Sequence, residues 1–154
     1  MPKFYIFPGN NSYLLREALL RRGNWQEVYT NLYWFKQLYD SKKINLDILP
    51  VCTVTSMNVY YIDELASNLY YKFNLKPYYI LSTFPRYYSI MNIPNRIGQK
   101  IASHLNKHTL TNIDAIKKAC LQPGKEIEWE KFWSWNNMVD DYRKEKFADV
   151  FPEY

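Results

Sequence analysis

The chain has 154 residues, 47% of them hydrophobic and 23% charged, and its formal net charge at pH 7 is +5. This balance is typical of a globular protein and argues against intrinsic disorder, and the length suits one domain with a single core. No apolar run approaches the roughly twenty residues that a membrane-spanning helix needs. The aromatic fraction of 18% indicates either a thick aromatic core or a large surface for a partner.

The first predicted element is a short strand over residues 4–7, because this run is aromatic and β-branched. Residues 8–11 break the strand, and Asn11 or Ser12 can cap a following helix. Apolar residues then recur at helical spacing as far as Gly23, which is the expected stop. The chain therefore opens as an α/β unit.

Three more segments are apolar or aromatic enough to be strands. Residues 28–35 read as a strand that runs into a short helical piece. Residues 46–54 predict an edge strand or a loop, because Pro50 interrupts the run and cannot donate a ladder hydrogen bond. Residues 78–84 predict a strong strand between two prolines.

Helices are predicted by apolar residues that recur on one face. One helix is expected over residues 59–73, capped by Ser56 or Asn58, and another over residues 95–107. Their inward faces are expected to carry Ile62, Leu65, Ala66, Leu69, Tyr70 and Phe73 in the first, and Ile97, Ile101, Ala102 and Leu105 in the second. A Thr111-x-x-Asp114 pattern resembles a capping box and opens a third helix that ends at Leu121.

The last thirty residues differ from the rest, since they follow a Pro-Gly pair, turn acidic and concentrate the tryptophans. We expect an α/β domain over residues 1–122, with a short central sheet flanked by helices, and an acidic, Trp-rich helical arm over residues 123–154. The arm either packs back onto the domain or docks on a larger partner. In the second case Trp129, Trp133 and Trp135 are the candidate anchors.

Charge is unevenly distributed along the chain. Residues 86–118 carry six basic side chains against one acidic side chain, whereas residues 126–154 carry eight acidic against four basic. A basic face attracts polyanions such as nucleic acid, an acidic protein surface or an anionic membrane. The alternative is a solvated face that the acidic arm neutralises within the fold.

Few residues form a pattern that could carry chemistry. His104 and His108 stand one helical turn apart, but no third ligand is spaced to complete a zinc site. The turn over residues 9–12 could bind an anion at a helix N-terminus, although capping alone explains it. We therefore expect no catalytic residue, no cofactor and no metal. Cys52 and Cys120 do not make a disulfide framework and predict free, buried thiols in a reducing compartment.

Two segments resemble tubulin tyrosine ligase-like proteins, especially those of protists. The first is similar to the start of these proteins, and its matching residues are Gly9, Asn10, Asn11, Ser12, Leu15, Arg16, Arg22, Gly23, Trp25 and Glu27. The second, over residues 105–116, resembles the Asn-His-x-x-Leu-Thr segment that precedes the catalytic core of the family. In the family, a lysine follows shortly after this Leu-Thr pair. Ile113 or Asp114 occupies its position in this chain.

The resemblance implies a small domain of the kind that precedes an ATP-grasp core, without the core itself. It implies a non-catalytic protein whose partners are tubulin or microtubule-associated proteins. The expected setting is a large assembly of the cytoplasmic cytoskeleton, such as a cilium or flagellum, and no membrane partner is expected. The basic residues expected to contact acidic tubulin are Arg16, Arg21, Arg22, Arg96, Lys100 and Lys107.

Two alternatives stay open at this point. The chain could be the amino-terminal fragment of an ATP-dependent tubulin glutamylase or glycylase whose catalytic core is absent here. It could also be a basic subunit of a ribosomal or mitochondrial complex, with nucleic acid as its partner; Arg86, Tyr87 and Tyr88 are the only hint of an RNA-binding groove.

Overall fold

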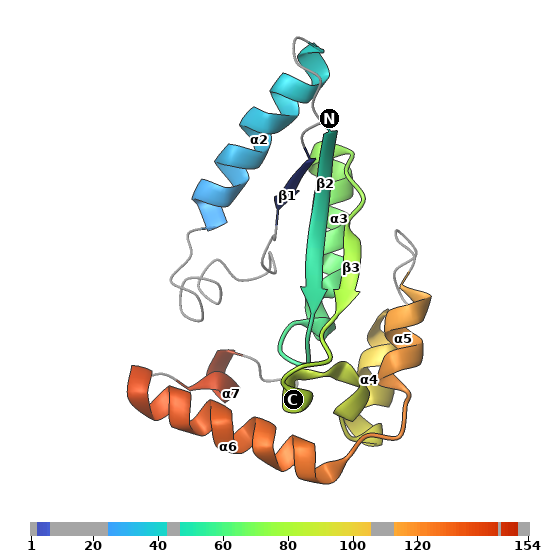
Figure 1. Ribbon diagram of the computed structural model, residues 1–154, viewed down its shortest axis with the longest axis vertical. Coiled ribbons are helices and arrows are strands. Elements are labelled where there is room, and N and C mark those ends of the chain that lie inside the picture. Colours follow the sequence, from blue (N-terminus) through green and yellow to red (C-terminus); the bar gives the residue numbers. More distant parts are fainter. Residues whose placement is uncertain (1–2, 7–24, 43–46, 106–112, 145, 151–154) are drawn as a thin grey trace. The chain divides into compact units, whose positions relative to one another are not determined.

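The computed structural model describes residues 3–6, 25–42, 47–105, 113–144 and 146–150, and these form a mixed α/β structure that is mostly helical (Figure 1). The elements, with short 3-10 turns marked η, are β1 (Lys3–Ile6), α2 (Trp25–Ser41), β2 (Asp47–Val54), η1 (Val59–Tyr61), α3 (Ile62–Phe73), β3 (Tyr78–Leu81), η2 (Arg86–Tyr88), η3 (Ile90–Asn92), α4 (Asn95–Leu105), α5 (Asp114–Cys120), α6 (Glu126–Arg143) and α7 (Phe147–Val150). The predicted α/β class is therefore confirmed.

The chain divides into two compact units. Unit 1 comprises Met1–Thr53 and Tyr61–Ile80, and unit 2 comprises Val54–Tyr60 and Leu81–Tyr154. The domain boundary predicted between residues 122 and 123 falls inside unit 2, and it stays a prediction.

Unit 1 is built on a three-stranded sheet in the order β1-β2-β3. β1 and β2 are parallel, from Lys3 opposite Asp47 to Ile6 opposite Pro50, and the arrows of β2 and β3 point the same way in Figure 1. The expectation that Pro50 makes its strand an edge or a loop was wrong, because β2 is the central strand. Pro50 faces the last residue of β1, so its missing N–H falls where that ladder ends.

The prediction of a strand over residues 28–35 was also wrong, because this segment lies within α2. Leu32 is buried, while Val28 and Phe35, four residues before it and three after it, are half-buried. This spacing is that of one helical face, so the burial of that face outweighs the strand propensity of the aromatic residues.

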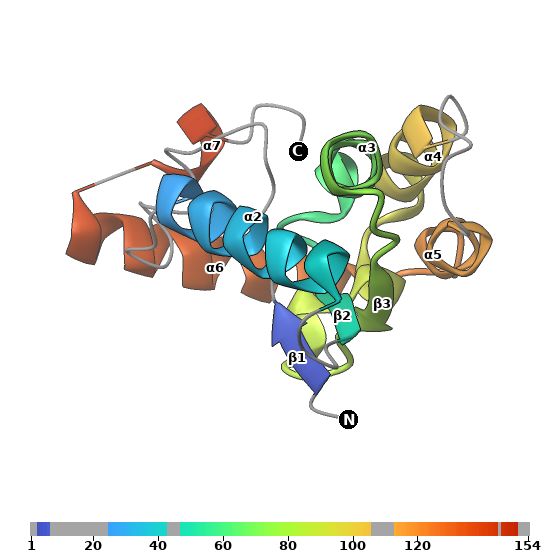
Figure 2. The same ribbon diagram turned by 90° about the horizontal axis from the view of Figure 1, so that it is seen from above.

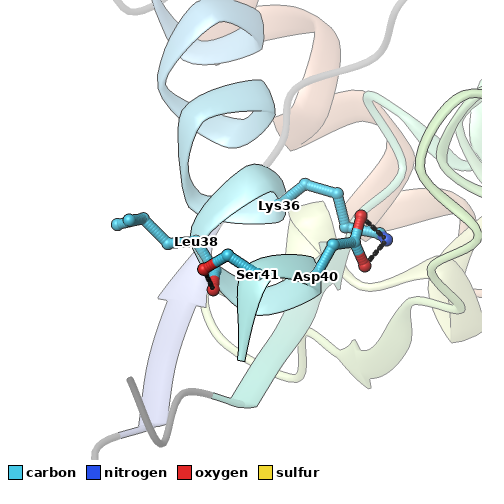
Figure 3. Close-up of polar contacts among 4 residues, drawn as sticks. All are labelled: Lys36, Leu38, Asp40 and Ser41. Atoms are coloured by element: carbon cyan, nitrogen blue, oxygen red, sulfur yellow. Dashed lines mark hydrogen bonds and ion pairs between the residues drawn. The ribbon is translucent and has the colours of Figure 1, made fainter. Parts of the chain in front are cut away.

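The C-terminal turn of α2 is held by two local contacts that Figure 3 shows. Lys36 Nζ lies 2.5 Å and 2.6 Å from the two carboxylate oxygens of Asp40, and the Ser41 hydroxyl donates to the carbonyl of Leu38 at 2.8 Å. Lys42 then adopts a positive φ of 53°. A left-handed residue at this position is a common end of a helix.

The helix predicted over residues 59–73 is confirmed, with η1 as its first turn and α3 as the rest. Its predicted inward face is buried except for Tyr70, which is half-buried. The cap prediction was wrong, because Tyr61 occupies the N-cap without a side-chain hydrogen bond. Asn58 instead accepts from the Thr55 N–H at 2.9 Å, and the Ser56 hydroxyl donates to the carbonyl of Tyr87 at 3.3 Å.

α2 and α3 lie on the same side of the sheet in Figure 2, and the rings of Tyr29 and Phe73 join them at 5.1 Å. In β3, Tyr78 and Ile80 are exposed, whereas Tyr79 and Leu81 are half-buried. This alternation is that of a strand with one face toward a core.

Unit 2 holds α4 and α5 in close contact. All four predicted inward residues of α4 are buried, and a Cβ added to Gly98 would lie 2.1 Å from the carbonyl oxygen of Cys120. At Gly124, before α6, an added Cβ would lie 2.0 Å from the carbonyl oxygen of Ile93. Glycine at both positions therefore permits a backbone approach that any side chain would prevent.

The C-terminal segment that was predicted to be helical forms α6 followed by α7. Phe132 of α6 is fully buried, with its ring stacked on that of Trp129 at 4.6 Å and edge-on to those of Tyr88 and Phe147. Asp140 accepts a hydrogen bond from the Phe147 N–H at 2.6 Å, which joins the end of α6 to α7. The core-facing side of α6 thus packs within its own unit.

Candidate functional site

The residues predicted to contact a partner are only partly within the described structure. Outside it lie Arg16, Arg21, Arg22 and Lys107. Within it are Arg96 and Lys100 on α4, both exposed, and the three tryptophans of α6.

α4 presents its two cations to solvent because its other face is committed to the core. Arg96 and Lys100 are four residues apart, so they lie on one face of the helix about one turn from each other. Lys118 of α5 is also exposed, while Lys117 lies 3.8 Å from the exposed carboxylate of Asp114. An ion pair of this kind is worth little, so the described parts of α4 and α5 present a basic surface.

The three tryptophans of α6 have different environments. Trp129 is only 7% exposed, and Trp133 is half-buried. Trp135 is 42% exposed and touches Tyr87, with 6.1 Å between ring centroids. Trp129 thus belongs to the core of unit 2, and Trp135 offers the largest accessible ring of the three.

A groove of about 570 Å³ lies beside the C-terminal half of α6 and is lined by Trp133, Asn137, Asp140, Asp141, Lys144, Lys146 and Ala148. Two carboxylates and two ammonium groups share this lining. Because the opposite charges balance, the groove has no clear preference for an anion or a cation.

Neither histidine chemistry nor thiol chemistry is supported by the described geometry. The His104 ring stacks on Tyr60 at 4.1 Å with an interplanar angle of 8°, and His108 lies outside the described residues. Among the residues that the structure describes, no group of three or more His, Cys, Asp or Glu side chains could hold a metal ion.

Both cysteines are free and buried, as predicted. Burial raises the pKa of the Cys120 thiol from its ordinary 9.0 to about 12, so this thiol stays protonated at neutral pH and is a poor nucleophile. Burial likewise raises the pKa of Tyr88, and the neighbouring Tyr87 adds to the effect.

Sequence reasoning missed two exposed apolar surfaces. Tyr33 and Trp34 on α2 are 53% and 55% exposed. The outer face of α6 carries Ile127, Met138 and Tyr142, all more than half exposed. The spacing of 11 and then 4 residues places these three side chains on one face of a helix, so helical periodicity could have identified this face.

Comparison with protein-family models, curated proteins and solved structures finds no match to this chain. The resemblance to tubulin tyrosine ligase-like proteins therefore stays a prediction from the sequence. No helix in the described parts of the chain is both long enough and apolar enough to cross a bilayer.

Proposed function

We propose that this chain is a non-catalytic, tubulin tyrosine ligase-like structural protein that binds microtubules or a ciliary (axonemal) assembly in the cytoplasm. The resemblance of residues 3–27 to the start of that family suggests tubulin as the partner. The structural observation that carries the proposal is the exposed pair Arg96 and Lys100 on α4.

The basic pair is presented on a rigid support. Gly98 lies between the two cations in the sequence, and the close approach of its backbone to Cys120 fixes α4 against α5. A fixed cationic face attracts an acidic protein surface over about 8–10 Å at physiological ionic strength, and added salt weakens this attraction. Acidic tubulin surfaces have the chemistry that such a face would recognise.

The architecture of unit 1 supports the same proposal. A parallel strand pair, with helices between successive strands, agrees with the small pre-ATP-grasp-like domain that the resemblance implies. In this proposal the domain serves to attach the protein to its partner, without a catalytic core.

The test is cosedimentation of the purified chain with taxol-stabilised microtubules, before and after subtilisin removes the acidic tubulin tails, with RNA as competitor. We expect saturable binding that survives RNA and weakens when the tails are removed. The variant R96E/K100E should lose about tenfold or more in affinity, because both contacts become repulsive. The control K42E/K76E makes the same change in net charge at exposed positions of unit 1 and should bind like the original chain.

Three outcomes would contradict the proposal. A soluble chain that does not sediment with microtubules would remove tubulin as the partner. Binding that RNA abolishes would favour a ribonucleoprotein subunit. Equal loss in both double variants would show that net charge, rather than the α4 face, governs binding.

A further inference from the structure

Three serines of this chain have a basic residue three positions before them: Ser89 follows Arg86, Ser103 follows Lys100, and Ser134 follows Lys131. A basic residue at this spacing is a charge pattern that basophilic protein kinases, which prefer positively charged substrates, select in their acceptor sites. The three serines differ in burial and in the charges beside them. These differences decide which hydroxyl such a kinase can reach.

Two of the serines are poor acceptors of phosphate, for different reasons. Ser89 is only 2% exposed, so its hydroxyl is out of reach in the folded chain. Ser134 is exposed, but Lys131 Nζ lies 3.2 Å from Glu128 Oε1. Glu130, four residues before Ser134, lies on the same helical face. Acidic side chains beside the acceptor repel the acidic substrate groove of a basophilic kinase.

Ser103 lies on the basic face of α4. Arg96, Lys100 and Ser103 follow one another at intervals of four and three residues, so they line up on one side of the helix, and all three are exposed. α4 contains no acidic residue. The helix ends at Leu105, two residues after the serine. Because helix ends fray, only the C-terminal part of α4 has to open for a kinase to bind it.

We propose that Ser103 is a phosphorylation site and that its phosphate lowers the affinity of the α4 basic face for an acidic partner, an effect that rests on the function proposed above. A kinase transfers the γ-phosphoryl group of ATP to the serine oxygen. The bond from phosphorus to the bridging oxygen of ADP breaks, and the hydroxyl proton passes to the catalytic carboxylate of the kinase. This chain supplies the acceptor hydroxyl and the basic residues that select it.

The added charge matches the charge of the face that it acts on. A phosphoserine carries about −1.5 to −2 charges at pH 7, which nearly cancels the charges of Arg96 and Lys100. Lys100 is three residues before Ser103, close enough on a helix to pair with the phosphate. Phosphorylation thus removes the positive potential of the face and also engages a cation that the partner would contact.

The first test asks whether Ser103 accepts phosphate. The full chain is incubated with Mg-ATP and either of two purified basophilic kinases, cyclic AMP-dependent protein kinase or protein kinase C, and the modified residue is identified by mass spectrometry. We expect phosphate at Ser103, loss of incorporation in Ser103→Ala, and full incorporation in the matched control Ser134→Ala. If neither kinase modifies Ser103, the proposal is overturned.

The second test measures the effect of the charge by cosedimentation with microtubules. The phosphorylated chain should bind about fivefold or more weakly than the unmodified chain, because the phosphate opposes both cations. Ser103→Glu adds one negative charge and should bind more weakly than the neutral Ser103→Gln. Equal affinity of the phosphorylated and unmodified chains would contradict the proposed effect.

A heparin column separates the failure of this proposal from the failure of the proposed function. Heparin is a general polyanion, so the phosphorylated chain should elute at lower salt than the unmodified chain whether or not tubulin is the partner. This shift in a chain that does not bind microtubules would contradict the proposed function alone. Elution of both forms at the same salt would show that the phosphate leaves the basic face unchanged, and would overturn the proposal.

Discussion

The Cys120 thiol is enclosed by the contact of α4 with α5, and its environment disfavours the thiolate. Its pKa is raised to about 12 because burial removes the water that would stabilise the charge. In the unfolded chain the same thiol ionises near its ordinary value of 9.0. The difference links folding stability to pH.

Stability should therefore fall as pH rises above 9, because the unfolded chain releases a proton that the folded chain retains. At pH 10 the loss from this group is on the order of 1 kcal/mol. Urea unfolding of the original chain and of Cys120→Ala, at neutral pH and at pH 10, measures it. The free energy of unfolding should fall more for the original chain than for the variant, and equal changes in both would contradict this account.

At the level of elements, the sequence predicted every described helix except α2. Residues 59–73 and 95–105 alternate apolar and polar side chains at a clear helical period, and their inward faces are nearly all buried. In α2 the aromatic run over residues 28–35 has both strand propensity and a helical stripe. Local preference cannot decide such a case, because the contact of Tyr29 with Phe73 is long-range.

For the candidate site, the sequence could predict which residues are exposed to solvent, but not which residues they contact. The α4 cations follow directly from helical spacing, since the buried face leaves Arg96 and Lys100 outward. The different environments of Trp129 and Trp135 were not predictable, because they depend on tertiary contacts: Trp129 is enclosed in the core of unit 2, whereas Trp135 lies at the edge of the contact with Tyr87 of η2 and stays 42% exposed.

The two sides of α6 should therefore respond differently to truncation. Phe132→Ala should cost about 3–5 kcal/mol, because it removes a fully buried ring and its contacts with Tyr88 and Trp129. Tyr142→Ala, at an 86% exposed position, should change the free energy of unfolding by no more than about 0.5 kcal/mol. Comparable losses for both variants would show that the assignment of the inner face is wrong.

For the whole molecule, the division into two units could not be predicted from the order of the residues. Unit 2 joins residues 54–60 to residues 81–154, which lie on either side of a long segment of unit 1. The Ser56 N–H donates to the carbonyl of Tyr88 at 2.8 Å, and Val59 is fully buried. Such contacts depend on the folded chain, and no composition change marks them in the sequence.

Removal of residues 123–154 should therefore destabilise the remainder. The cut removes Trp129 and Phe132 from the core of unit 2 and uncovers η2, including the Tyr88 ring. We expect residues 1–122 to bind a hydrophobic dye and to lose a cooperative unfolding transition that the full chain retains. Cooperative unfolding of the shortened chain without dye binding would instead support a domain boundary at residue 122.

The close backbone approaches at Gly98 and Gly124 also limit how this sequence can diverge over evolutionary time. Every replacement adds at least a Cβ, which would meet a carbonyl oxygen of Cys120 or Ile93 at about half the normal separation of two nonbonded atoms. The exposed neighbours Gln99 and Lys125 face solvent and carry no such restriction. Among functional descendants of this chain, the two glycines should persist unchanged while the residues beside them vary freely.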